Sequence, residues 1–146
     1  MRITQESDYA LRISYLLASD GGILDSGAIA KATGVTERFT VKILRKLTQS
    51  GVVVSKKGAS GGYRLALAPG DITIRRIVEV IDGPVEISKC LDGNYECSRV
   101  GNDKQQCTFH LIFAKINKTI ADKLDGVTLD NVIDENFDVN KILSKI

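Results

Sequence analysis

The feature of this sequence that most restricts its fold is a pair of short helical segments joined by a glycine-containing turn. Ser26 and Thr36 each stand where a helix would begin, because their hydroxyl groups can accept a hydrogen bond from the first helical turn. Residues 33–36 connect the two segments, and Gly34 can adopt the left-handed backbone that ends a helix. The spacing predicts a helix-turn-helix unit over residues 26–50.

The second helix of this unit, expected from Thr36 to about Ser50, has two distinct faces. One face is apolar and is predicted to point inward. Its residues are Phe39, Ile43, Leu44 and Leu47. The other face is basic and polar, with Arg38, Lys42, Arg45 and Gln49. A helix with these two faces is typical of one that lies in the major groove of DNA with its apolar side on a core.

A β-hairpin is predicted directly after these helices. Residues 52–54 are all valine and residues 63–67 alternate in polarity, so both segments favour strands. The intervening tip, residues 56–62, is rich in glycine and lysine, which suits close approach to a phosphate. A hairpin in this position is a wing. The residues expected to contact DNA are Arg2, Thr36, Arg38, Phe39, Thr40, Lys42, Arg45, Lys56, Lys57, Ser60, Gly61 and Tyr63.

The distribution of charge supports the same interpretation. The net charge of the chain is only +2, but residues 31–65 hold eight bases and one acid, a net charge of +7. A basic block inside an otherwise mildly acidic chain is expected of a phosphate-binding face, although a solvated lysine-rich surface would have the same composition. The block argues against a winged-helix adaptor that binds only proteins.

Composition excludes several other classes of protein. With 146 residues, 43% of them hydrophobic and 26% charged, the chain is expected to form one globular domain with an attached helical arm. No apolar run approaches the ~20 residues of a membrane span. The N-terminus turns polar too soon for a signal peptide, so we expect a cytoplasmic protein. We find no nucleotide-binding glycine motif and no nucleophile–base pair, so an enzyme is not expected.

A long helix is predicted from Phe109 onward. Its apolar stripe consists of Phe109, Ile112, Phe113, Ile116, Ile120 and Leu124. A second subunit is the natural cover for this stripe, and packing on a first helix over residues 4–18 is the alternative. The expected fold is mainly α with a small β-hairpin. It comprises a winged helix-turn-helix domain (1–83), a cysteine-containing segment (84–107), a dimerisation helix with a short following helix (108–133) and a tail (134–146).

The three cysteines of the chain, Cys90, Cys97 and Cys107, fall within eighteen polar, turn-rich residues. The only histidine, His110, follows three residues after the last of them. Thiolates gathered on a loop suit a soft metal centre, whereas the absence of a CxxC pair weakens a zinc-finger interpretation. From the residues alone, three alternatives stay open: an iron–sulfur cluster, zinc held by three cysteines and a histidine, or free thiols that switch by oxidation.

The sequence resembles the IscR/NsrR-type winged-helix iron–sulfur regulators of bacteria, over residues 1 to about 133. The cysteine gaps are longer than those common in that family. The stretches that carry the resemblance are residues 1–4, residues 8–12, the wing over residues 57–66, the cysteine trio and residues 128–132.

This resemblance implies a homodimeric transcription regulator, a repressor or dual regulator, whose affinity for a palindromic double-stranded DNA operator is controlled by an iron–sulfur cluster. In IscR-like members a histidine three residues after the last cysteine completes a 2Fe-2S site, and His110 has this position. In NsrR-like members an aspartate of the first helix of the other subunit completes a 4Fe-4S site, and Asp8 has that position. We favour the 2Fe-2S cluster. A cluster-free, thiol-based winged-helix regulator is the alternative function.

Overall fold

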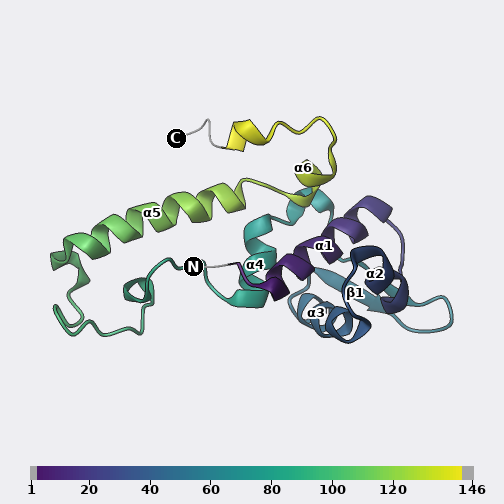
Figure 1. Ribbon diagram of the computed structural model, residues 1–146, viewed down its shortest axis with the longest axis horizontal. Helices are drawn as coiled ribbons and strands as arrows, with labels where there is room; N and C mark the ends of the chain where they lie inside the picture. Colours follow the sequence, from purple (N-terminus) through teal and green to yellow (C-terminus); the bar gives the residue numbers. More distant parts are fainter. Residues whose placement is uncertain (1–2, 143–146) are drawn as a thin grey trace.

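The computed structural model describes residues 3–142, so the predicted DNA contact Arg2 lies outside the described residues. The helices are α1 (Gln5–Asp20), α2 (Ser26–Thr33), α3 (Glu37–Gln49), α4 (Ile74–Asp82), α5 (Thr108–Asp125) and α6 (Leu129–Ile133). The strands are β1 (Val53–Lys56) and β2 (Gly62–Leu65). Short 3-10 turns lie at Pro69–Asp71, Lys89–Leu91, Lys104–Gln106 and Val139–Ile142. The predicted fold, mainly helical with one small hairpin, is confirmed (Figure 1).

The helix-turn-helix unit forms as predicted, with one correction at its start. Asp25, rather than Ser26, caps α2: its carboxylate accepts a hydrogen bond from the backbone N–H of Ala28 at 2.9 Å. Ser26 is already the first helical residue, so its hydroxyl is not placed to cap the helix. The helix ends at Gly34, whose φ of 69° is the left-handed conformation that glycine adopts at low cost.

The hydrophobic core lies between α1, α3, α4, α6 and the start of β1. The side chains that are almost fully buried there include Ile13, Leu17, Ile43, Leu44, Leu47, Val52, Ile77 and Leu129. Truncating one of the larger side chains to alanine typically costs about 2–5 kcal/mol, because the cavity left behind collapses only partly. The predicted inward face of α3 is therefore largely confirmed, with three of its four members in this core.

Helix α6 belongs to this winged domain and not to the long helix that precedes it in the chain. Leu129 is 1% exposed in the main core. Two backbone hydrogen bonds of 2.9 Å, from Leu129 N–H to the Ile72 carbonyl and from Ile74 N–H to the Val127 carbonyl, attach the segment to the start of α4. The expected unit of residues 108–133 therefore contains two helices with different surroundings, because Leu129, four residues after the end of α5, lies in the core of the winged domain.

The wing is an antiparallel pair in which Val53 faces Leu65 and Lys56 faces Gly62. Leu24 adds a short bridge to Tyr63 through two backbone hydrogen bonds of 3.0 and 2.8 Å. This bridge attaches the base of the wing to the segment that leads into the helix-turn-helix. The orientation of the wing relative to α3 is thereby fixed by backbone bonds.

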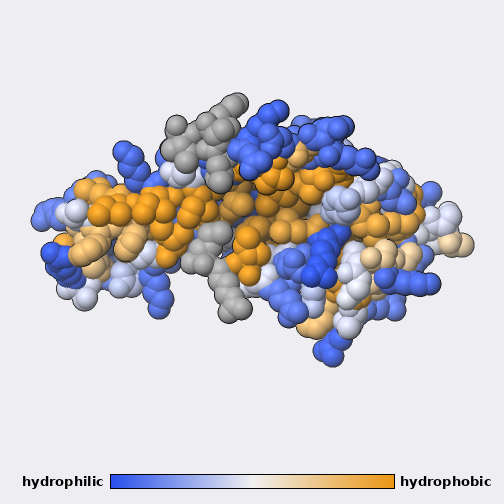
Figure 2. All heavy atoms as spheres, turned by 45° about the horizontal axis from the view of Figure 1, so that its top comes forward, coloured by the Kyte–Doolittle hydropathy of each residue, from blue (hydrophilic) through white to orange (hydrophobic). Residues whose placement is uncertain are grey.

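Helix α5 extends away from the winged domain, and the cysteine-containing segment lies beside its outer end, remote from α3 (Figure 1). An apolar band runs along α5 on the face shown in Figure 2. Three of the six predicted stripe residues are exposed: Phe109 (62%), Ile112 (47%) and Ile116 (47%). The other three, Phe113, Ile120 and Leu124, are half-buried, so the described part of the chain leaves about half of the stripe uncovered.

Candidate functional site

The basic face of α3 is exposed, as its amphipathic pattern predicts. Arg38, Lys42 and Arg45 are all exposed, whereas Ile43 and Leu44 on the other side are fully buried. A helix that presents cations outward and is held to its domain by apolar packing can approach a polyanion without losing its own support. This face, together with the wing tip, forms the candidate DNA-binding surface.

Two residues of α3 lie where the sequence pattern did not place them. Phe39, expected on the inward face, is 45% exposed and rests edge-on against Tyr9 of α1, with ring centroids 6.3 Å apart. At about 100° per residue, Phe39 lies about 90° from the centre of the face that Thr40, Ile43, Leu44 and Leu47 bury, so its ring is at the rim of the core. Thr40, expected to contact DNA, is fully buried and is therefore removed from that set.

Val41 belongs to the same exposed face and was not singled out from the sequence. Its side chain is 43% exposed. It follows Arg38 by three residues and precedes Arg45 by four, and this helical spacing is the signal that could have placed it there. An exposed aliphatic side chain on such a helix is suited to contact with a thymine methyl group.

At the start of α3, Thr36 has the N-cap position, but its side chain makes no capping hydrogen bond and is exposed. The hydroxyl of this predicted DNA contact is therefore not engaged at the helix start.

The wing tip exposes Lys56, Lys57 and Ser60, while Tyr63 at its base is half-buried against the core. The turn requires glycine at position 61, because a Cβ atom there would collide with the carbonyl oxygen of Lys56. Of the predicted wing contacts, the two lysines and Ser60 are thus freely presented to a ligand. Tyr63 mainly supports the hairpin.

An acidic side chain of α1 lies against this surface. The carboxylate of Glu6 is 3.0 Å from Lys42 Nζ and 2.7 Å from Lys46 Nζ. Hydrogen bonding from Lys46 is the main reason that the pKa of Glu6 lies below its ordinary value, with partial burial opposing it and Lys42 adding to it. Glu6 therefore carries its negative charge at neutral pH.

All three cysteines lie within the described residues, and each is half-buried and unpaired. Cys90 Sγ lies 3.3 Å from Ser88 Oγ. Backbone N–H groups of Arg99 and Val100 donate to Cys97 and lower the pKa of its thiol. Cys107 has the N-cap position of α5 but makes no side-chain capping bond. The segment thus ends where the long helix begins.

The other two predicted ligands lie apart from each other. His110 is in the first turn of α5, and its Nδ1 atom is buried without a hydrogen-bond partner among residues 3–142. It lines a cleft of about 490 Å³, and Glu86 and Leu91 also line this cleft. Asp8 is on α1, where its carboxylate pairs with Arg12 at 2.7 Å. Within the described residues, no three cysteine, histidine, aspartate or glutamate side chains converge as a group that could hold a metal ion.

Residues 3–135 match the Rrf2 family, described as iron-dependent transcriptional regulators. This chain belongs to the Rrf2 family. It is similar to an Rrf2-like HTH-type transcriptional regulator of Rhodobacter capsulatus, with 33% identity over 97% of this chain and 98% of that protein. It is also similar to IscR of Aliivibrio salmonicida, with 26% identity over 93% of this chain and 79% of that protein.

Solved structures support the fold. The structure of CymR, described as the global cysteine regulator of B. subtilis, matches with a TM-score of 0.73 and 24% identity, over 91% of this chain and 96% of that one. Together, these comparisons identify an Rrf2-type DNA-binding transcriptional regulator and not an enzyme, which confirms the predicted winged-helix fold and the coarser part of the predicted function.

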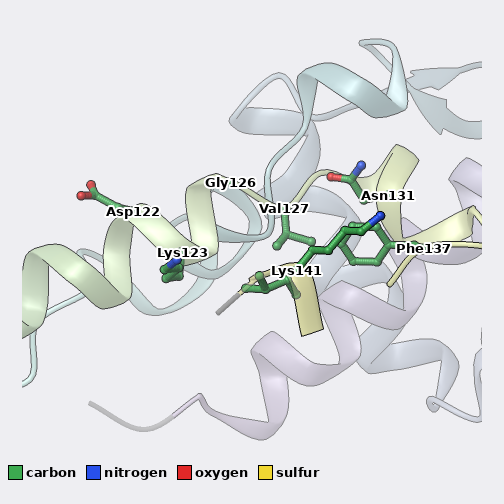
Figure 3. Close-up of a pocket in the computed structure, with 8 residues that line it drawn as sticks. Asp122, Lys123, Gly126, Val127, Asn131, Phe137 and Lys141 are labelled. Carbon is green, nitrogen blue, oxygen red and sulfur yellow. The ribbon is translucent and has the colours of Figure 1, made fainter. Parts of the chain in front are cut away.

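One further cavity of this Rrf2 protein lies away from the surfaces described above. It measures about 660 Å³ and lies between the end of α5, α6 and the following segment. Val127 and Phe137 provide apolar walls, as the close-up in Figure 3 shows. None of the predicted DNA contacts or ligand residues lines it.

Among residues 3–142, no helix is long and apolar enough to cross a membrane.

Proposed function

We propose that this Rrf2 regulator binds a palindromic operator as a homodimer, and that an iron–sulfur cluster held by Cys90, Cys97 and Cys107 controls its DNA affinity. The observation that carries the proposal is the position of three unpaired, half-buried thiols on one irregular segment that leads directly into α5. Thiolates are the ligands that iron–sulfur clusters require. The description of the family as iron-dependent supports the same chemistry.

His110 is the proposed fourth ligand, and a 2Fe-2S cluster is the proposed type. The buried Nδ1 atom of His110 has no hydrogen-bond partner among the described residues, so its imidazole is available to bind another group. Asp8 is the less favoured candidate, because its carboxylate is already paired with Arg12. A 4Fe-4S cluster would accompany that choice. The donor set of three thiols and one imidazole fits an iron–sulfur group, which when bound supplies redox and nitric oxide sensitivity.

The positions of the cysteines in the chain explain how binding could reach the DNA surface. Cys90 follows the linker from α4, and Cys107 immediately precedes α5. A group held by all three thiols would tie together the two ends of the segment that joins the winged domain to α5. Without those bonds, the start of the segment is still held to α5 by the Asn117 side chain, which bonds to Val85 and Ile87, and the part that carries the cysteines is held mainly by its own short turns. A change in how α5 meets the winged domain would alter the spacing of two α3 helices on DNA.

The proposed homodimer forms through α5. Its exposed apolar stripe, which includes Phe109, Ile112 and Ile116, is a contiguous surface of the kind that marks protein association (Figure 2). A second copy of the same helix would cover it with matching side chains. A two-fold dimer also presents two α3 helices, which suits the two half-sites of a palindromic operator.

Protein isolated without air tests the cofactor. We expect visible absorbance, with about two iron and two sulfide ions per chain for a 2Fe-2S cluster. Cys97→Ser should be colourless and His110→Ala should lose the cluster faster, while Ser98→Ala, next to a ligand, should behave as wild type. Iron and sulfide absent from wild type prepared in this way would argue against the cluster.

A thiol-based regulator without a cluster is the second candidate. It is favoured by the separation of the three cysteines, which do not converge within the described residues. The likeness to the fold of CymR, described as a cysteine regulator, is compatible with it. The same preparation distinguishes the two: iron-free protein whose DNA affinity changes when its thiols are oxidised supports the thiol mechanism.

A further inference from the structure

The carboxylate of Glu6 lies against the basic face of α3. It lies in the first turn of α1, and its carboxylate accepts from Lys42 at 3.0 Å and forms an ion pair with Lys46 at 2.7 Å. Its side chain is only 22% exposed, so water screens these contacts less than those of a fully exposed pair. Two lysines of α3 thus share the carboxylate of Glu6.

The other two cations of α3 have no such partner. Within residues 3–142, no ion pair involves Arg38 or Arg45. The four basic side chains of this helix therefore fall into two pairs, one available to DNA and one already neutralised in part. The side chain of Lys42 is 54% exposed, so it can reach a phosphate. To do so, its ammonium group must leave Glu6 or share it.

We propose that Glu6 competes with DNA phosphates for Lys42 and Lys46 and thereby limits the sequence-independent affinity of the protein for DNA. Phosphate contacts made by lysine and arginine supply nearly all non-specific binding, and each contact adds to its dependence on salt. An internal carboxylate that holds two lysines weakens this contribution on every sequence. The contacts of exposed side chains with base edges are not affected. The proposal rests on α3 being the DNA-contacting helix.

The test is the affinity of the full-length protein for a random-sequence duplex, measured by fluorescence anisotropy over a range of salt concentrations. We expect Glu6→Gln to raise the affinity at low salt by roughly 3- to 10-fold. The slope of log K against log salt should become steeper by about one for each lysine that gains a phosphate contact. Glu6→Ala should act in the same direction.

Glu37→Gln is the matched control. It removes the same charge from the first turn of α3, but the side chain of Glu37 contacts Ser26 at 3.2 Å rather than a lysine. We expect Glu37→Gln to raise affinity only through its change in net charge, without steepening the slope of log K against log salt. In a background of Lys42→Ala with Lys46→Ala, Glu6→Gln should raise affinity no more than Glu37→Gln does and should leave the slope unchanged. Melting followed by circular dichroism shows which variants are folded.

One further variant distinguishes a failure of this proposal from a failure of its premise, which is that α3 contacts DNA. Arg45→Ala should weaken binding; if it does not, α3 is not the DNA-contacting helix and the premise fails. If Arg45→Ala weakens binding while Glu6→Gln leaves affinity and slope unchanged, or lowers them, Glu6 does not compete with phosphate. A steeper slope, or a gain larger than that of Glu37→Gln, that persists for Glu6→Gln in the double-lysine background would also overturn the proposal, because the effect would not pass through these lysines.

Discussion

Individual residues show where sequence patterns carry enough information and where they do not. Thr4 caps α1 through a local contact that a sequence pattern can indicate, because its hydroxyl needs only the backbone N–H of Ser7, three residues ahead. Phe39 was wrongly expected to point inward, because its spacing of four from Ile43 was counted without the position of the whole buried face. At about 100° per residue, Thr40 lies near the centre of the face formed with Ile43, Leu44 and Leu47, and Phe39 lies about 90° from that centre.

At this scale we predict that the wing lysines contribute phosphate contacts. Lys56→Ala combined with Lys57→Ala should weaken binding to operator and random DNA alike. The salt slope should flatten by about one for each lost contact. Lys118→Ala is a suitable control, because it removes an exposed lysine of α5, remote from the wing in sequence, that pairs only with the exposed Asp122. An unchanged slope in the double variant would exclude the wing from the DNA surface.

The elements were predictable because their signals are local. The caps of α1, α4 and α6 and the glycine after α2 can all be identified in the sequence. The return of α6 to the core could not be predicted, since it depends on Leu129 meeting α1, far away in the chain. For the same reason, the distance between Cys90 and Cys107 does not follow from their spacing, because the irregular segment between them has no periodicity.

The contact between the end of α4 and the start of α1 predicts that the stability of the fold depends on pH. Asp82, at the end of α4, accepts from Thr4 Oγ1 at 2.6 Å, from Thr4 N–H at 3.1 Å and from Ser7 Oγ at 2.8 Å. Partial burial alone would raise the pKa of Asp82, but these hydrogen bonds from α1 lower it below its ordinary value. The stabilisation is therefore present above the ordinary aspartate pKa and is lost as pH falls through the lowered one.

We expect Asp82→Asn to reduce the free energy of unfolding at pH 7 by about 1 kcal/mol or less, because the carboxylate is exposed and water screens its contacts. The difference from wild type should shrink as the pH falls from the ordinary aspartate pKa of about 4 through the lowered pKa of the native carboxylate. Denaturant unfolding at several pH values measures this. Asp20→Asn, whose side chain bonds only to the nearby Gly22 N–H, is the control. A difference that stays constant with pH would refute the linkage.

The whole molecule is asymmetric in what it leaves exposed: a cationic surface at α3 and the wing, and an apolar stripe along α5 (Figure 2). The sequence predicted both surfaces, because the faces of α3 and α5 follow helical spacing and the wing tip is a local run of glycine and lysine. How the cysteine-containing segment connects them was not predictable, since that depends on what its three thiols bind. We therefore propose that the molecule is one half of a dimer in which this segment joins the DNA-binding surface to the apolar stripe of α5.

At this scale we predict that Ile112→Asp combined with Ile116→Asp yields a monomer, because carboxylates in a buried apolar interface lose their hydration without gaining partners. Sedimentation velocity of wild type should show a dimer. Lys118→Asp, placed about 200° around the helix axis from Ile116, should leave the dimer intact. A monomeric wild type at micromolar concentration would remove α5 from its proposed role.

The most direct test of the central claim is the DNA affinity of a single anaerobic preparation before and after its iron is removed by a chelator. The duplex is one selected by the protein from a random pool, and Cys97→Ser is measured in parallel. We predict that iron removal changes the affinity of wild type by about 5- to 150-fold and does not change that of the variant. Equal affinity of the iron-loaded and iron-free wild type would contradict control of DNA binding by a cluster.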